Sequence, residues 1–285
     1  MDAVALTLVL TSAGLHASWN LLAKRVPGTV APVWLYAFVS AVVVTPAMIV
    51  VAPRAAASVT PVVLGFVLGS ALLHVGYLVS LQRGYGRGDL SLVYPLARGS
   101  GPALATLAAV VLLGERPGPA ALVGTTLVAA AAFLLAGGGG RASAPAVRAG
   151  LATGAFIAAY TVWDATAVAR LGAAPIVYYG LSEWLRALLM APVAWRRRAE
   201  LGRAWRAAGG SMLGVGVLSP LAYLLVLMAF QRAPVSLVAP TREVSILITV
   251  ALGAGLLGEG ERVRRGVAAL GMVAGVALLA TARAA

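Results

Sequence analysis

Two short stretches of the chain repeat the same order of residues, and the fold can be read outward from them. Residues 91–95 are Ser-Leu-Val-Tyr-Pro and residues 236–240 are Ser-Leu-Val-Ala-Pro, and an arginine follows each proline, at Arg98 and Arg242. Further matches lie on both sides, at offsets between 144 and 149 residues. Several weak matches in one order indicate an internal duplication. The further pairs are Leu15–Asn20 with Ala159–Asp164, Gln82-Arg83 with Gln231-Arg232, and Leu113–Glu115 with Leu257–Glu259.

The composition is that of a membrane protein. Apolar residues make up 61% of the 285 residues and charged residues 11%, against roughly 45–50% and roughly 25% in soluble domains. So few charges do not cover a water-facing surface, so most of the outer surface must face lipid. The apolar runs are about 20 residues long and continuous, which predicts helices and not the alternating strands of a barrel. The predicted spans are 3–23, 30–52, 59–82, 90–113, 119–136, 147–169, 173–195, 209–231, 235–257 and 264–282.

The glycine-rich segment near the middle divides the ten spans into five and five. We expect a first repeat at 1–136, a linker at 137–146 and a second repeat at 147–285. Because each repeat has an odd number of spans, the second must enter the membrane in the opposite orientation. The sequence therefore predicts an all-α membrane protein of two inverted five-helix repeats. In such transporters the substrate site lies near the midplane between the repeats.

The basic residues between spans are distributed unequally. Connections after the odd-numbered spans hold 14, and the other connections with the C-terminus hold 5. The positive-inside rule then predicts a cytoplasmic location for the first set and both termini outside. The first set is Lys24, Arg25, Arg83, Arg87, Arg141, Arg148, Arg196, Arg197, Arg198, Arg203, Arg206, Arg262, Arg264 and Arg265, and the second is Arg54, Arg116, Arg170, Arg232 and Arg283.

Several function classes lack support in the sequence. There is no cysteine, and two histidines are too few for a histidine-rich metal site. The scattered basic residues form no nucleic-acid-binding face. No Walker, HExxH or GxSxG pattern is present, which argues against ATP drive and against an enzyme. We therefore expect no cofactor, no metal and no nucleic-acid partner.

The chain resembles the EamA-type permeases of the drug/metabolite transporter superfamily. The resemblance covers nearly the whole chain and rests on the duplicated five-span unit, the string from His16 to Lys24, and the Leu-Gly-Glu turns at Glu115 and Glu259. It implies a multi-pass protein of the inner (plasma) membrane that moves a small metabolite, often outward, through a cavity between the repeats. A lipid-linked substrate flippase and a membrane-embedded non-transport protein remain the alternatives. Protons are a candidate coupling ion, and both a monomer and a homodimer stay open.

The repeat-equivalent arginines are the strongest candidates for a transport site. Arg98 and Arg242 lie near the middle of their spans, shortly after Pro95 and Pro240. Paired, proline-interrupted spans in two halves indicate a binding site. The alternative is that both arginines bond freed carbonyls or a fixed carboxylate and only hold helices together. The other charged residues within spans are Asp164, Glu183, Arg186 and Glu243.

Each of these four residues is either structural, as part of an ion pair or as an anchor, or a group that takes part in coupling. Glu183 and Arg186 share a helix face at a spacing of three residues, which favours a structural pair, although Glu183 is also a candidate proton carrier. Glu243 points about 100° away from its neighbour Arg242, so the two are poor partners. Asp164 stands beside a tryptophan, as Asn20 does in the first repeat, which favours anchoring at the interface.

Polar aromatic residues also match between the repeats. Tyr160 matches His16, and Tyr223 matches His74, so these groups either ring a cavity or bond neighbouring helices. We expect Glu115 and Glu259 to complement the N-termini of the helices that follow them. The candidate substrate-binding residues are Arg98, Arg242, His16, Trp19, Asn20, His74, Tyr94, Tyr160, Trp163 and Tyr223.

The arginines suggest the substrate class. A guanidinium stays charged when it is desolvated, so an anionic group must offset it. Glu183 is expected to take Arg186, which leaves a central arginine without a permanent partner. The sequence therefore predicts an anionic or zwitterionic metabolite, such as an amino acid or a phosphonate. Arg98→Gln and Arg242→Gln are each expected to abolish its transport.

Overall fold

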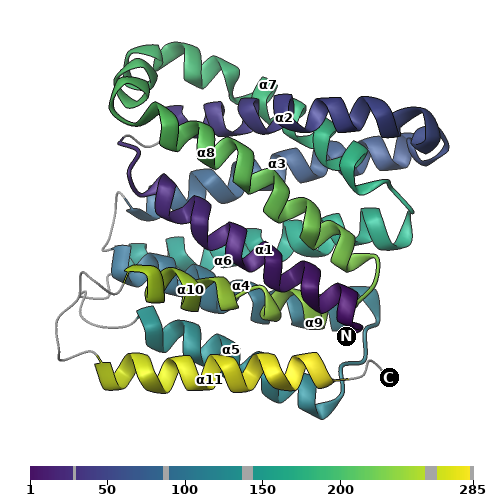
Figure 1. Cartoon of the computed structure of the whole chain (residues 1–285), viewed down its shortest axis with the longest axis vertical. Helices are drawn as coiled ribbons and strands as arrows, with labels where there is room; N and C mark the ends of the chain where they lie inside the picture. The colour runs from purple at the N-terminus through teal and green to yellow at the C-terminus, as the bar shows by residue number, and fades with distance from the viewer. Residues whose placement is uncertain (28–29, 86–89, 137–143, 254–261, 283–285) are drawn as a thin grey trace.

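A computed structural model describes residues 1–27, 30–85, 90–136, 144–253 and 262–282. These residues form helices and contain no strand. Figure 1 shows them packed side by side as one bundle. The helices are α1 (Ala3–Ala23), α2 (Ala31–Ala55), η1 (Ala56–Ser58), α3 (Pro61–Tyr85), α4 (Leu90–Leu113), α5 (Pro119–Ala136), α6 (Ala144–Ala165), η2 (Thr166–Arg170), α7 (Pro175–Arg196), α8 (Arg198–Phe230), α9 (Val235–Thr241), α10 (Val244–Gly253) and α11 (Arg262–Thr281).

The outer surface of the bundle is apolar. Val111 and Leu112 on α4 are each 70% exposed, and large apolar side chains are exposed on most other helices as well. Six helices of the described residues are long and apolar enough to cross a membrane, and two shorter apolar helices accompany them. Because such a surface is stable only against lipid, the chain is an all-α, multi-pass membrane protein.

The main helix contacts obey a symmetry: a contact made by a helix of the first five spans has a counterpart made by the equivalent helix of the last five. α1 packs on α8, and its counterpart α6 packs on α3. α2 packs on both α7 and α8, and α7 likewise packs on α3. The pairs α2–α7 and α5–α11 map onto themselves and lie toward opposite ends of the bundle (Figure 1). This is the packing expected of two repeats related by a two-fold axis.

Small residues allow the closest of these contacts. Gly124 on α5 and Gly275 on α11 face each other, and a Cβ on either would lie 2.8 Å from the carbonyl oxygen of the other. Gly154 on α6 lies against Ser100 and the backbone of Ala97 on α4. Glycines at such positions let helix backbones approach closely in lipid, where no hydrophobic force drives helices together.

The two ends of the chain lie together. The amino group of Met1 donates to the carbonyl oxygens of Ala280 (3.4 Å) and Ala282 (3.1 Å) at the end of α11. Asp2 caps α1 by accepting a hydrogen bond from the Ala5 amide at 2.6 Å. Both termini therefore lie at the same end of the bundle, as an even number of spans requires. Their location outside the cell stays a prediction.

Two predicted boundaries were wrong. The basic segment 196–206 was expected to be a loop, but α7 ends at Arg196 and α8 begins at Arg198, so almost the whole segment is helical, and the non-helical backbone within α8 is at Ala208. Its alanine, arginine, leucine and glutamate residues are strong helix formers. The ninth span was expected to be continuous, but it breaks between α9 and α10 at Arg242 and Glu243. Pro240 lies shortly before the break, but α4 is continuous across Pro95 at the equivalent place, so the proline alone does not determine the break.

Candidate functional site

Arg98 is held by residues from the other repeat. It lies on α4, is 6% exposed, and its Nε lies 3.2 Å from Oε2 of Glu243. Its Nη2 donates to the hydroxyl of Ser245 at 3.1 Å. Because Glu243 lies at the break between α9 and α10 and Ser245 follows it, Arg98 ties α4 to this break. Glu243 does not pair with its neighbour Arg242, as the helix geometry predicted.

Arg242 has no such partner. It is 5% exposed, and no carboxylate of the described residues forms an ion pair with it. Its Nη2 donates to the hydroxyl of Tyr160 at 3.4 Å, and its guanidinium carbon lies 6.0 Å from the ring centre of Tyr223. Its Nε has no hydrogen-bond acceptor within the described part of the chain. A buried cation thus faces two aromatic side chains, and the acid that acts on it, Glu243, is engaged in the ion pair with Arg98.

The sequence explains why only one of the two arginines is paired. At the offset of 144 residues that relates Arg98 to Arg242, Glu243 corresponds to Gly99 and Ser245 corresponds to Gly101. Each partner of Arg98 therefore has a glycine as its counterpart in the first repeat. Exchanging the repeats would place Arg242 beside glycines, which carry no group to bind it.

Aromatic side chains from four helices form a cluster beside this cation. His74 on α3 stacks on Tyr160 on α6 with ring centres 4.2 Å apart, and Tyr223 on α8 meets both of them edge-on, at 5.6 Å from His74 and 6.1 Å from Tyr160. Tyr77 and Tyr179 extend the cluster, since they lie 5.9 Å from Tyr160 and 5.6 Å from Tyr223. The structure thus brings together three predicted residues and two that sequence reasoning missed.

Asp164 lies deep in the bundle and not at an interface. It is fully buried on α6, its Oδ1 accepts from the hydroxyl of Tyr178 and its Oδ2 from the hydroxyl of Tyr223, each at 2.6 Å. No basic residue of the described chain forms an ion pair with it. The position near the end of the span was misleading, because Asp164 lies six residues before the end of η2 and is nevertheless fully buried between helices.

The remaining buried charges neutralise each other. Glu183 and Arg186 on α7 form an ion pair one helical turn apart. The Glu183 side chain is 2% exposed and that of Arg186 is 15% exposed, so the pair lies almost wholly within the bundle.

Other predicted site residues make local or structural contacts. Asn20 donates to the carbonyl of His16 at 2.7 Å, and Trp19 lies edge-on to His16, all on α1. Trp163 stacks on Phe66 at 4.3 Å and donates to its carbonyl at 2.8 Å, which fastens α6 to α3. The structure therefore does not bring the two tryptophans into the aromatic cluster around Arg242.

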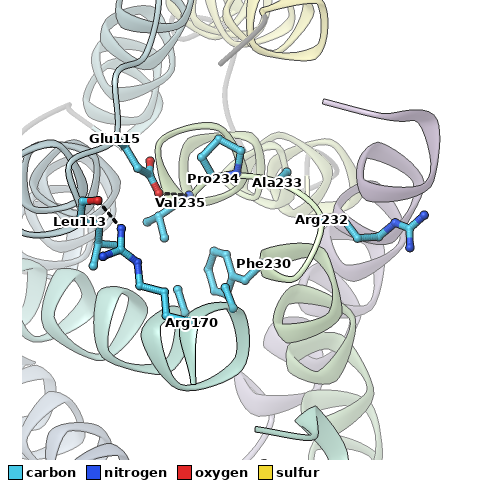
Figure 2. A pocket seen from close by; sticks show the side chains of 10 residues that line it. Leu113, Glu115, Arg170, Phe230, Arg232, Ala233, Pro234 and Val235 are labelled. Atoms are coloured by element: carbon cyan, nitrogen blue, oxygen red, sulfur yellow. Dashed lines mark hydrogen bonds between the residues drawn. The ribbon is translucent and has the colours of Figure 1, made fainter. Parts of the chain in front are cut away.

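A surface cavity of about 270 Å³ lies at the start of α9, away from the buried arginines (Figure 2). Glu115 accepts hydrogen bonds there from the amides of Val235 (2.8 Å) and Ser236 (2.9 Å). Arg170 donates to the carbonyl of Leu113, whereas Arg232 points away from the cavity and pairs with Asp2 at 3.4 Å (Figure 2). Glu115 was expected to serve α5, but it caps α9 in the other repeat.

Some predicted residues lie outside the described side chains. These are Tyr94 and Pro95, whose backbone belongs to α4, and Glu259, together with the greater part of the linker, residues 137–143. Within the described residues, no three metal-binding side chains lie together. Sequence reasoning also missed Tyr178, and one signal could have found it, since a buried carboxylate without an ion pair needs hydroxyl or amide donors from neighbouring spans.

The comparisons with known proteins place this architecture. Residues 145–281 match the EamA-like transporter family. A solved crystal structure is similar over 99% of this chain and 97% of its own, with a TM-score of 0.72 and 21% identity, which establishes the shared fold. No curated protein matches the chain by sequence. The second half of the chain therefore matches the EamA-like transporter family, and this match agrees with a permease of the drug/metabolite transporter type.

Proposed function

We propose that the chain is a secondary transporter of a small anionic or zwitterionic metabolite, such as an amino acid or a phosphonate, which binds at Arg242 between the two repeats. The single observation that carries the proposal is the buried guanidinium of Arg242, which forms no ion pair with a carboxylate of the described chain. Intramembrane ionisable residues mark substrate pathways by default. A carboxylate or phosphonate group would supply the missing countercharge.

The chemistry around Arg242 fits such a group. A planar guanidinium offers paired N–H donors that match a carboxylate or phosphonate, and its Nε remains available. The hydroxyl of Tyr160 lies beside its Nη2. The rings of Tyr223 and His74 border the same place and suit the apolar part of a small metabolite.

The pairing of Arg98 supports a positioning role for that residue. Glu243 adjoins Arg242 at the break between α9 and α10, so the ion pair with Arg98 fixes the backbone that carries Arg242. Discontinuous helices are the usual place for a transport site, because their ends supply unpaired backbone groups. In this proposal Arg242 binds the substrate, whereas Arg98 holds the broken span against α4.

Uptake into vesicles tests the proposal. The purified protein is reconstituted, and entry of radiolabelled methylphosphonate, acetate and L-glutamine is compared with entry of tetraethylammonium. We expect saturable uptake of at least one of the first three, loss of that uptake in Arg242→Gln, and wild-type uptake in Arg232→Gln, whose guanidinium is half-exposed at the surface. Recovery of the solute unchanged supports transport over an enzymatic reaction.

Two results would overturn the proposal. One is uptake of tetraethylammonium alone. The other is wild-type uptake of the anionic probe by Arg242→Gln, because the buried arginine would then be a structural residue.

A further inference from the structure

The buried charges leave one acid and one arginine without an ionic partner. Arg98 pairs with Glu243 and Arg186 pairs with Glu183, so those four residues are neutral as two pairs. Asp164 and Arg242 are left, and neither forms an ion pair within the described residues. Their charges are opposite, so the interior is neutral as a whole only while Asp164 is ionised.

Tyr223 connects these two groups. Its hydroxyl donates to Oδ2 of Asp164 at 2.6 Å, and its ring faces the guanidinium of Arg242 at 6.0 Å. Tyr223 therefore contacts the acid through its hydroxyl and faces the arginine with its ring. A change of charge at one of the two groups alters the electrostatic free energy of the other across this side chain.

The groups around Asp164 are mostly neutral. From α7 Tyr178 donates to it, and from α8 Tyr223 does so. Ser70 on α3 also faces the carboxylate. The charged groups of the helices that pack around α6 are Arg186 and Glu183 on α7, Arg98 on α4, and Arg242 with Glu243 after α9. Arg186 acts on Asp164 but is engaged by Glu183, and of the charged groups named here only Arg242 forms no ion pair within the described residues.

We infer that Asp164 is a proton-binding site coupled to the anion site at Arg242, so that one proton enters with each monovalent anion. This inference rests on the proposed function, because it assigns the coupling ion of that same site. When an anion neutralises Arg242, the negative charge of Asp164 loses its counterpart. The carboxylate then takes a proton on an oxygen and returns it when the anion leaves on the other side.

The charge balance makes the coupling electroneutral. The empty site holds Arg242 as a cation and Asp164 as an anion, and the loaded site holds an added anion and an added proton. The interior has the same net charge in both states. Since linkage is reciprocal, protonation of Asp164 must also strengthen anion binding at Arg242 by the same factor.

Arg242→Gln imitates the neutralised arginine and tests the coupling without any ligand. Infrared spectroscopy of the purified protein follows the carbonyl band of a protonated carboxyl group against pH, and Asp164→Asn assigns the band that belongs to Asp164. We expect Arg242→Gln to raise the proton affinity of Asp164 about tenfold or more. Arg232→Gln, a surface arginine paired with Asp2, serves as the matched control and should leave the titration unchanged.

An unchanged titration of Asp164 in Arg242→Gln would overturn the inference. The inference would also be overturned if Asp164→Asn removed no titrating band, because Asp164 would then stay in one protonation state. Both readouts are free of substrate, so they are independent of whether the proposed anions bind.

Proton uptake on anion binding tests the linkage directly. Methylphosphonate is added to weakly buffered wild-type protein and to Asp164→Asn at the same pH, and the difference in proton uptake is measured. We expect about one proton per bound anion in the wild type beyond that in the variant. Binding without this excess contradicts the coupling and leaves the proposed function intact, whereas a titration shift in Arg242→Gln without any anion binding contradicts the proposed function alone.

Discussion

Arg98 and Arg242 occupy the same position in the two repeats, but their surroundings differ. Arg98 lies on a continuous helix and has Glu243 and Ser245 as partners from the other repeat. Arg242 lies where the ninth span is interrupted, donates to Tyr160 and faces the ring of Tyr223. The same residue at the same place thus forms an ion pair in one repeat and forms none, within the described residues, in the other.

The difference shows how a duplicated sequence acquires two roles. Gly99 takes the place that Glu243 has in the second repeat, so the exchange of one residue decides which arginine receives the acid. The paired arginine joins the repeats, and the unpaired one is available to a ligand. Asymmetry between the repeats, and not the repeat itself, therefore defines the candidate site.

The largest expected effect is the loss of stability in Arg98→Gln. The substitution leaves the Glu243 carboxylate buried without a cation, and breaking a buried pair in this way costs about 3–5 kcal/mol. Arg242→Gln removes a cation that has no partner, so it should change the free energy of unfolding far less. Denaturation of both variants in detergent micelles, followed by circular dichroism, measures the difference.

The double variant Arg98→Gln with Glu243→Gln controls for loss of the arginine side chain. Because it removes both charges, it should recover most of the lost stability. If Arg98→Gln and Arg242→Gln were equally destabilising, the contrast between the two positions would be wrong.

Two carboxylates hold the ninth span, Glu243 and Glu115, and Glu115 should contribute less to the free energy of unfolding. Glu115 lies before α5, and it caps the start of α9 by accepting hydrogen bonds from the amides of Val235 and Ser236. Glu115→Gln retains one acceptor oxygen and should cost about 1 kcal/mol, as loss of a helix cap does. Glu200→Gln, which alters an exposed contact with Arg197, is the control and should be nearly neutral in the same unfolding assay.

Two aromatic residues on α6 should separate structure from binding. Trp163→Phe removes the indole hydrogen bond to Phe66 and should cost about 0.6–1.7 kcal/mol, with anion binding unchanged. Tyr160→Phe keeps the ring and removes the hydroxyl beside Arg242, so it should weaken anion binding more than it alters stability. If anion binding were instead lost only in Trp163→Phe, the binding site would lie near Trp163 and not beside Tyr160.

The smallest expected effect concerns the surface pair of Arg232 and Asp2. The two side chains are about half exposed and lie 3.4 Å apart. An exposed pair contributes about 0–1 kcal/mol and is screened by salt. Arg232→Gln should therefore be close to the wild type in unfolding, and a loss as large as that of Arg98→Gln would show that exposure does not separate the two pairs.

Much of the fold could be predicted from the sequence. Apolar length predicted α1, α4 and α5 as observed, because the membrane sets the length of a helix, whereas α8 begins eleven residues before its predicted span and the ninth span is broken. The sequence could not predict that the ninth span breaks at Arg242 while α4 continues past Pro95, since both spans carry a proline at the equivalent position. Whether a proline interrupts a helix depends on the neighbours that satisfy the freed carbonyls.

The site could be predicted only in part. Intramembrane charge identified the two arginines and Asp164, but the choice of partner depends on which helices meet. Nothing local to Glu243 indicates that it faces Arg98 across the repeats, and nothing near Tyr178 indicates Asp164. Glu115 was likewise assigned to the nearest helix in sequence, whereas it caps α9, which is remote in sequence and close in space.

The most direct test of the central claim is a thermal-shift titration of purified protein with methylphosphonate, acetate and L-glutamine in turn. A ligand that binds the folded state raises its Tm with concentration. We predict that at least one of these compounds stabilises the wild type and the Arg98→Gln with Glu243→Gln double variant, and that the stabilisation disappears in Arg242→Gln. Equal stabilisation of Arg242→Gln would contradict the claim that the unpaired arginine binds the substrate.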